Sequence, residues 1–398
     1  MRKLTTALGL PQHRFASILV VGTNGKSSVT RMTAALLGAH GLRTGASVSP
    51  HTESWSQRTL VDGDEIGAEA WAQAVDQVAR AAEGVNRSLE EGDAVTQFEA
   101  ATAASFVALA NARVEVAVIE AGLGGRLDAT NTLPSKVTVL TSIGLDHTEW
   151  LGESEVEIAA EKLAVLRDQT TLVMGEVSAE VEALAEQTAR ERGARLVPAP
   201  ADPGADIQLR AAGEFQRRNF AIACAATEAF LGRLERGSVA QVAAALVIPG
   251  RLEKIAASPT VFVDAAHNPD GAAALARSLA EVADGRRLIA CLAVLADKDA
   301  EGMVAALALA PALDRVVCTE LPPAALAGHG RPGARSRPAR ELAAICEGLG
   351  LAAEARPDFG SALQRGRELA AVEPESLLLV TGSHYAIAPA RSLFVDGP

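Results

Sequence analysis

Three observations predict an α/β protein of two domains with mainly parallel sheets. Short runs rich in Val, Ile and Leu alternate with longer alanine-rich stretches, as strand–helix repeats do. The chain has 398 residues, more than one ordinary hydrophobic core serves. A glycine-rich segment around residue 25 separates a β-branched run from a helical one, as in mononucleotide-binding domains.

The elements follow in order along the chain. A strand over 17–22 leads into a helix from about Lys26, and a helix containing Lys162 is expected within 155–167. Proline at position 269 fits the first turn of a helix, so a further helix is expected to begin there. The other runs expected to form strands are 114–122, 136–144, 170–175, 260–266, 286–295, 314–319 and 376–382.

A Pro249-Gly250 pair interrupts this pattern between an expected helix over 238–246 and a strand near residue 260. Proline next to glycine is typical of a break between elements. We therefore predict an N-terminal domain at 1–248, a linker at 249–257 and a C-terminal domain at 258–398.

Charge and composition exclude several function classes. The formal net charge of −12, without a Lys/Arg-rich block, disfavours binding to a nucleic-acid backbone. No apolar run reaches the roughly 20 residues of a membrane helix, and the N-terminus lacks the apolar stretch of a signal peptide. We expect a cytoplasmic protein. The 4 cysteines show no C-x-x-C spacing, so we expect buried thiols and no zinc site.

The stretch VVGTNGKSSVT resembles a P-loop that has been shortened, because Val20 stands where a standard P-loop has its first glycine. Gly22 and Gly25 would let backbone N–H groups face an anion at the positive end of the following helix. Lys26 would reach the outer phosphates, and Ser27 stands at the Mg²⁺-binding hydroxyl position. The structural alternative is a tight strand-to-helix turn with a surface lysine.

Acidic and imidazole groups follow two expected strands. Glu120 ends one, and Asp146-His147 follows another, so these groups could converge at one sheet edge and hold Mg²⁺. A histidine ligand is unusual for Mg²⁺, and a hydrogen-bonded structural histidine is the alternative.

The glycine-rich loop AGLGGRLDATN does not complete a dinucleotide-binding motif, because Leu127 occupies the place of the third glycine. Taken singly, Lys162 would be a solvated helix lysine. Arg251, Asp264 and His267 would likewise be turn residues.

Together these segments resemble the dihydrofolate synthase/folylpolyglutamate synthase family of the Mur ligase superfamily, from Gly22 to about Arg391. The resemblance implies a P-loop mononucleotide-binding ATPase domain followed by a smaller Rossmann-like domain. The segments that carry it are GTNGKSS, SPHTESWSQR, TQFEAAT, IEAGLGGRLDATN, TSIGLDHTEWLG, the Glu161-Lys162 pair, FQRRN, PGRLE, DAAHNPDG, LADKD and TGSHYA.

The resemblance assigns roles to single residues. It places ATP at the shortened loop and at three more distant residues, with two Mg²⁺ ions beside the phosphates. It places the pterin side of the substrate at TQFE and Asp128, and the incoming glutamate near Ser383. The implied ATP contacts are Gly22, Thr23, Asn24, Gly25, Lys26, Ser27, Ser28, Asn219, Arg251 and Asp264, with His267 beside the nucleotide. The implied metal ligands are Ser49, Glu120, His147 and Lys162 as a carbamate, and the pterin-side residues are Thr96, Gln97, Phe98, Glu99 and Asp128.

The implied reaction is ATP-dependent addition of L-glutamate to dihydropteroate or reduced folates through an acyl phosphate, by a monomer. Only 21 residues precede Gly22, fewer than in members that accept dihydropteroate, so folates are the better-supported substrate. Two alternatives stay open: a ligase acting on a non-folate carboxylate, and a nucleotide-binding protein that has lost ligation.

Overall fold

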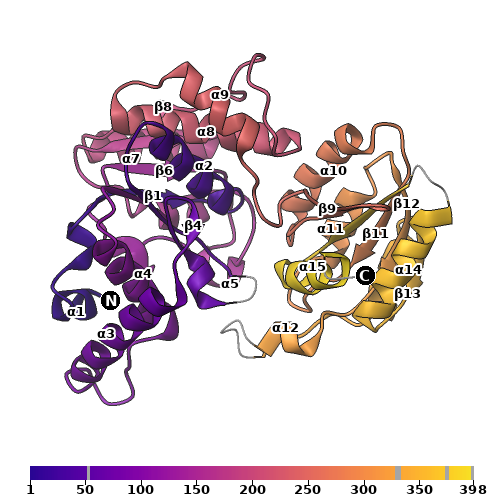
Figure 1. The fold of residues 1–398 in the computed structure, drawn as a ribbon, viewed down its shortest axis with the longest axis horizontal. Helices are drawn as coiled ribbons and strands as arrows, with labels where there is room; N and C mark the ends of the chain where they lie inside the picture. The colour runs from indigo at the N-terminus through magenta and orange to yellow at the C-terminus, as the bar shows by residue number, and fades with distance from the viewer. Residues whose placement is uncertain (52–53, 328–332, 373–375, 396–398) are drawn as a thin grey trace. The chain divides into compact units, whose positions relative to one another are not determined.

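The computed structural model describes residues 1–51, 54–327, 333–372 and 376–395 (Figure 1). The chain forms two units, one made of Met1–Leu209 and Arg217–Leu246, the other of Arg210–Gln216 and Val247–Pro398. Each unit has its own sheet and its own hydrophobic core. None of the helices described is both long and apolar enough to cross a membrane.

The sheet of the first unit has the order β4-β3-β2-β5-β1-β6-β7-β8. The β3 strand pairs antiparallel with β2 and β4, and the other neighbours are parallel. The predicted strands of this unit are all present. The bounds are β1 Ala16–Val21, β2 Thr44–Ser47, β3 Thr59–Val61, β4 Asp64–Glu65, β5 Val116–Glu120, β6 Val137–Leu140, β7 Thr171–Met174 and β8 Arg195–Pro198.

Helices pack on this sheet, so the residues of its central strands are buried on both faces. Leu19 and Val21 pack with Phe106 of α4 in one cluster, which α6 and α7 complete. The helix after the P-loop, α2, packs on β1, β2 and β5. The helices begin and end at α1 Arg2–Ala7, α2 Lys26–Ala39, α3 Ala68–Asn86, α4 Gln97–Asn111, α5 Thr148–Leu151, α6 Glu155–Leu163, α7 Ala179–Glu191, α8 Glu214–Leu231 and α9 Arg236–Ala245, with 3₁₀ turns η1 Pro11–His13, η2 Trp55–Arg58 and η3 Ala129–Thr132.

The sheet of the second unit has the order β13-β12-β11-β14-β10-β9. It is parallel except for β9, which pairs antiparallel with β10 and lies within the segment 249–257. The four strands predicted for this unit are present. The bounds are β9 Glu253–Ala257, β10 Thr260–Val263, β11 Leu288–Leu292, β12 Leu313–Cys318, β13 Ala352–Ala355 and β14 Leu377–Thr381.

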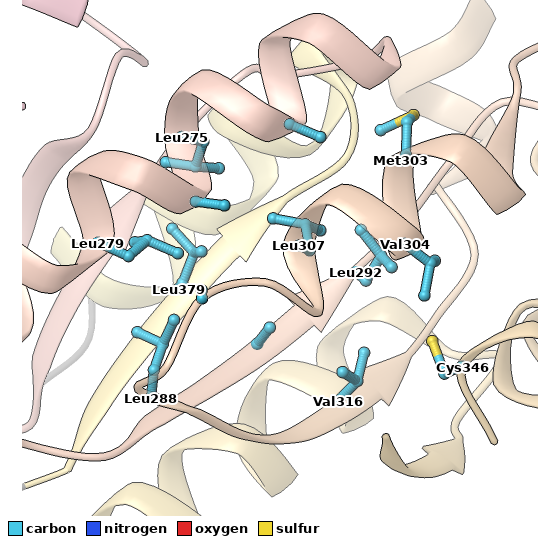
Figure 2. Packing of buried hydrophobic residues seen from close by; sticks show 14 of the residues in the cluster. Leu275, Leu279, Leu288, Leu292, Met303, Val304, Leu307, Val316, Cys346 and Leu379 are labelled. Atoms are coloured by element: carbon cyan, nitrogen blue, oxygen red, sulfur yellow. The ribbon is translucent and has the colours of Figure 1, made fainter. Parts of the chain in front are cut away.

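Alternate residues of these strands serve two cores, as in a sheet covered by helices on both faces. Leu377 and Leu379 belong to the cluster with α10, α11 and α13, shown in Figure 2. Leu378 and Val380 belong to the cluster with α14 and α15. The helices are α10 Pro269–Ala283, α11 Ala300–Leu307, α12 Pro323–Ala327, α13 Ala339–Gly348, α14 Phe359–Val372 and α15 Ile387–Val395, with the 3₁₀ turn η4 His384–Ala386.

Strand order determines which loops meet. In the first unit β1 lies between β5 and β6, so the loops that follow these three strands share one edge of the sheet. In the second unit β14 lies between β11 and β10, which brings the segments after residues 263, 292 and 381 together. Ligands of parallel α/β sheets bind at such edges.

Candidate active site

The shortened P-loop ends in a left-handed glycine that starts α2. Gly25 is the N-cap residue with φ +83°, a conformation that side chains disfavour. A Cβ on Gly25 would lie 2.5 Å from Oδ1 of Asn219 on α8. The structure therefore brings Asn219, predicted from FQRRN, against the phosphate loop, whose helix directs its positive end there.

Residues after β6 hold the loop in place, and the sequence did not predict this role. The amide of Thr23 donates to the carbonyl of Ser142 at 2.8 Å, and the amide of Asn24 donates to the Ser142 hydroxyl at 3.2 Å. The Thr141 hydroxyl donates to the carbonyl of Asn24 at 2.6 Å. At Gly22, a Cβ would lie 2.0 Å from the Thr141 hydroxyl oxygen, so glycine is required.

The cation and hydroxyls of the loop suit a phosphate. Lys26 Nζ donates to the carbonyls of Gly22 at 3.1 Å and Thr23 at 3.0 Å, which keeps the ammonium over the loop. The buried hydroxyl of Ser28 makes no hydrogen bond to any described residue. Since a buried polar atom without a partner is costly, Ser28 fits a site completed by a phosphate oxygen.

The site predicted for Mg²⁺ begins with three residues in contact. The Ser27 hydroxyl lies 3.0 Å from Oε1 of Glu120 and 3.0 Å from the carbonyl oxygen of Ser49. The Ser49 amide donates to Oε2 of Glu120 at 2.8 Å. Two oxygens about 3.0 Å apart match adjacent corners of a Mg²⁺ octahedron with bonds of about 2.1 Å. The residues therefore fit the ion.

His147 follows the neighbouring strand β6 and is the N-cap residue of α5, in a left-handed conformation with φ 53°. Its Nε2 is 3.9 Å from Oδ1 of Asp146, and its amide donates to the same carboxylate at 3.0 Å. The described part of the chain contains no cluster of three His, Cys, Asp or Glu side chains arranged for a metal. Hydroxyl and phosphate oxygens would have to complete the coordination shell of the Mg²⁺ ion.

Lys162 on α6 is 4% exposed, so it is not the solvated lysine that its sequence context alone suggests. Burial, followed by the nearby charge of Lys26, lowers its pKa from 10.5 to about 7, although Asp146 and Asp128 act in the opposite direction. A Cβ on Gly125 would lie 2.7 Å from the carbonyl oxygens of both Glu161 and Lys162. The glycine-rich loop thus packs directly on the turn that carries the lysine.

The pterin-side residues predicted from TQFE have local structural partners. Thr96 caps α4 and forms a reciprocal capping box with Glu99. Glu99 also accepts a hydrogen bond from the amino group of Met1. Gln97 is exposed at the first position of α4, and a Cβ on Gly122 would lie 2.2 Å from the ring of Phe98. Phe98 therefore packs against the glycine-rich loop.

Asp128 organises the same loop. Its Oδ2 accepts hydrogen bonds from the amides of Gly122 at 3.0 Å and Leu123 at 2.9 Å. Its Oδ1 accepts from the amide of Thr130 at 2.9 Å, where it caps η3. Phe98 and Asp128 thus meet at Gly122.

In the second unit, Asp264 is fully buried at the end of β10. Its oxygens accept hydrogen bonds at 2.8 Å from the amides of Leu252 and Ala266, and burial raises its pKa despite the nearby Arg251. Asp264 thus ties the PGRLE segment to β10. Glu253, which the sequence did not single out, accepts from the Gly250 amide at 2.7 Å and pairs with Arg391.

His267 and Ser383 lie at the same edge of the second sheet. The ring of His267 contacts the ring of His384 edge-on, with centroids 6.2 Å apart, and Ser383 immediately precedes His384. The Ser383 hydroxyl accepts a hydrogen bond from the amide of Tyr385 at 3.3 Å.

An aromatic and basic cluster follows Ser49, and the sequence did not predict it. The Arg58 guanidinium lies 4.2 Å from the centre of the Trp55 ring, and its Nε donates to Nδ1 of His51 at 2.9 Å. The W-x-x-R spacing is the available signal, because residues i and i+3 eclipse in a 3₁₀ turn. Thr52 and Glu53 of the SPHTESWSQR segment lie outside the described residues.

Fold and site together define a Mur ligase. Residues 20–197 match the family model for the Mur ligase middle domain, and residues 250–384 match the model for the Mur ligase glutamate ligase domain. A relative from Mycobacterium tuberculosis, named dihydrofolate synthase/folylpolyglutamate synthase, is 36% identical over 99% of this chain and 89% of its own length. The chain belongs to the dihydrofolate synthase/folylpolyglutamate synthase family, as its motifs predicted, and is an ATP-dependent ligase.

Solved structures of relatives have the same fold. The Mycobacterium tuberculosis folylpolyglutamate synthase complexed with ADP superimposes with a TM-score of 0.89 at 34% identity, covering 100% of this chain and 94% of that one. The bifunctional folylpolyglutamate synthase/dihydrofolate synthase from Yersinia pestis, complexed with AMPPNP and a Mn ion, superimposes with a TM-score of 0.82 at 26% identity. The match covers 98% of this chain and 92% of that one.

Proposed function

We propose that this protein joins L-glutamate to reduced folates, and to dihydropteroate, with hydrolysis of ATP to ADP and phosphate. The observation that carries the proposal is the contact between Ser27, Glu120 and Ser49 at the start of the P-loop helix. This combination of a hydroxyl, a carboxylate and a helix N-terminus suits a nucleotide–metal complex. The ADP and AMPPNP complexes of the two solved relatives support the assignment.

Ser49, Glu120 and His147, with Lys162 as a carbamate, would hold two Mg²⁺ ions beside the phosphates. When bound, the ions neutralise negative charge on the phosphoryl group that is transferred. Lys26 contributes a further positive charge from the loop. Catalysis of this kind depends on position and electrostatics, because phosphoryl transfer needs little covalent help from the protein.

The environment of Lys162 supports carbamylation. Only a neutral amine attacks CO₂, and a pKa of about 7 leaves a large neutral fraction near neutral pH. The carbamate would turn a buried cation into an anion beside Lys26, which relieves the repulsion between the two amines. The same anion supplies oxygen ligands that Mg²⁺ prefers.

In the proposed reaction, a carboxylate oxygen of the folate attacks the γ-phosphorus of ATP and ADP leaves. The amine of L-glutamate then attacks the acyl carbon, phosphate leaves, and the amine loses a proton. Gly22, Thr23, Asn24, Gly25 and Ser28 would bind the phosphates. Asn219, Arg251 and Asp264 would contact the nucleotide, with His267 beside it and Ser383 near the glutamate.

Exposed apolar side chains on the glycine-rich loop and on α5 support an aromatic substrate. Leu123 and Leu127 of the glycine-rich loop are 42% and 92% exposed, and Trp150 of α5 is 73% exposed. Large apolar side chains on a surface loop next to polar site residues are typical of a ligand-binding surface. We assign the pterin side of the substrate to this loop, with Thr96, Gln97 and Glu99 at the start of α4.

The proposal extends to the protein's surroundings. We propose a cytoplasmic monomer that takes small molecules as partners and binds neither membranes nor nucleic acids. The net charge of −12 supports the last point. The P-loop domain would carry the ATP and folate side, and the C-terminal Rossmann-like domain the glutamate ligase side.

The test offers purified protein ATP, Mg²⁺ and L-glutamate with tetrahydrofolate, with dihydropteroate, or with neither, and resolves the products by mass. We expect one glutamate residue added per ADP formed, and no product from a Lys26→Ala control. The proposal is refuted if neither pterin receives glutamate. In that case, ADP release with a different carboxylate would indicate a non-folate ligase. The absence of any substrate-dependent ADP release would indicate a protein that has lost ligation.

A further inference from the structure

Two of the cysteines form a buried pair in the second unit. Cys318 is the last residue of β12, Cys346 lies on α13, and their sulfur atoms are 3.7 Å apart. Both side chains are fully buried. Figure 2 shows Cys346 at the margin of the core cluster to which both residues belong. Neither residue has a role in the proposed ligation.

The other two cysteines lie in different parts of the structure. Cys291 belongs to the core cluster on the opposite face of the second sheet. Cys224 lies on α8, in the part of that helix that belongs to the first unit. The fold therefore selects one pair of thiols, although the sequence contains no C-x-x-C spacing.

The core has a small cavity next to one of the two cysteines. A cavity of about 10 Å³ lies against Cys346 and is lined by apolar side chains, among them Leu307, Val316 and Leu351. A disulfide needs its sulfurs about 2.05 Å apart, so the pair must close by less than ~2 Å. In a close-packed interior such a shift is resisted, and a neighbouring cavity reduces that resistance.

We propose that Cys318 and Cys346 are a reversible redox pair, which a hydroperoxide converts to a disulfide that fastens α13 to β12. One thiol is first oxidised by H₂O₂ to a sulfenic acid, and one water is released. The second sulfur then attacks that sulfenic sulfur, forming the S–S bond and releasing the second water. A dithiol reductant restores both thiols.

The contact between the sulfurs favours Cys346 as the first nucleophile. The hydrogen bond within the pair lowers the pKa of Cys346 and raises that of Cys318, which burial raises further. Because both sulfurs are buried, oxidation must proceed through local opening of this part of the core. The crosslink closes a chain segment with ends 28 residues apart, so it restricts the unfolded chain and stabilises the second unit.

The experiment treats the reduced full-length protein with H₂O₂ and measures the thiol count, the intact mass, the disulfide-linked peptides and the melting temperature. We expect two of the four thiols to be lost. The mass should fall by two hydrogen atoms, one linked peptide pair should join Cys318 to Cys346, and the melting temperature should rise by several degrees. Dithiothreitol should reverse all four changes.

Two variants make the result specific. Cys346→Ser should abolish the crosslink and the rise in melting temperature, whereas Cys224→Ser should keep both. The proposal is overturned if the folded protein retains four thiols under conditions that oxidise the urea-unfolded chain. A linked peptide containing Cys224 or Cys291, or oxygen added to sulfur without a crosslink, would overturn it equally. None of these outcomes depends on the ligase assay.

Discussion

At the scale of single residues, Lys162 gives the clearest relation between stability and function. A buried ammonium is unfavourable, and the lowered pKa measures that cost. Below pH 7 the folded and unfolded chains both hold the proton, and the folded state bears a penalty on the order of 5 kcal/mol. Between pH 7 and 10.5 the unfolded chain binds more protons, so stability rises with pH.

Replacing Lys162 by methionine should therefore stabilise the protein and inactivate it. We expect the free energy of unfolding to rise most near pH 6, with the gain shrinking as the pH increases above 7. Glutamate ligation should fall by at least about 100-fold, since charge stabilisation at the phosphoryl group is lost. Urea unfolding at several pH values and a product assay measure the two effects.

A second variant separates the carbamate from a simple packing role. In Lys162→Ala, bicarbonate or a short-chain carboxylic acid should restore part of the activity, because each can supply an anion in the space left. If Lys162→Met lowers stability at pH 6, or if the alanine variant is fully active without additives, the account of this residue is wrong.

Leu127 is the residue that most directly reports on the aromatic substrate. Since it is 92% exposed, Leu127→Ser should leave the melting temperature unchanged. In the proposed complex the bound folate covers the Leu127 side chain. Loss of that contact should raise the KM for tetrahydrofolate roughly tenfold and leave the KM for ATP unchanged. Leu309→Ser, at a site in the second unit that is 79% exposed, is the matched control. Equal KM values for the two variants would contradict the assignment.

At the scale of elements, the sequence predicted the strand β1, the shortened loop and α2 best. Glycines and a lysine at fixed positions between a β-branched run and a helix are a specific signal of a phosphate-binding loop. The contacts from Thr141 and Ser142 were not predictable, because hydroxyl residues after a strand also occur in ordinary turns. They hold the loop from a strand more than 100 residues away along the chain.

Gly25→Ala tests this element against a matched control. Both Gly25, with φ +83°, and Gly41, with φ +88°, have left-handed backbones, so alanine costs each about 1 kcal/mol of backbone strain. Only at Gly25 would the methyl group meet Asn219, whereas nothing lies within 4 Å at Gly41. Calorimetry with Mg-ADP should show at least about tenfold weaker binding for Gly25→Ala alone. Similar losses in both variants would contradict the role given to the loop.

Several elements were not predictable because their sequences lack a strand signal. The β2 strand reads TGAS and β13 reads AAEA, neither of which is rich in β-branched residues. Tertiary pairing with β5 and with β12 makes them strands. The same limit applies to β9, whose residues EKIAA pair antiparallel with β10.

At the scale of the whole molecule, long-range contacts decide which motif residues can share a site. The structure brings Asn219 to Gly25, and Ser27, Ser49 and Glu120 to one another, although these residues lie far apart along the chain. It also gives Glu99 and Asp264 structural partners: Glu99 forms the capping box of the T-x-x-E pattern with Thr96, and Asp264 accepts from the amides of Leu252 and Ala266. A carboxylate that caps a helix and one that contacts a ligand look alike in sequence, since both accept hydrogen bonds.

The second unit depends on its own core, so a deep truncation there should destabilise the protein. Leu379 is fully buried in the cluster of Figure 2, and Leu379→Ala should lower the free energy of unfolding by about 2–5 kcal/mol. Leu309→Ala, at an exposed position, should change it by less than about 0.5 kcal/mol. Urea unfolding measures both variants. If Leu379→Ala unfolds at the same urea concentration as the unsubstituted protein, the packing described is wrong.

The central claim is that ATP activates a carboxylate of the folate. The most direct measurement uses folate labelled with ¹⁸O in that carboxylate and follows the oxygen during glutamate addition. An acyl phosphate intermediate predicts that one labelled oxygen appears in the inorganic phosphate for each amide formed, as detected by mass spectrometry. Glutamate addition accompanied by phosphate without the label would contradict the account.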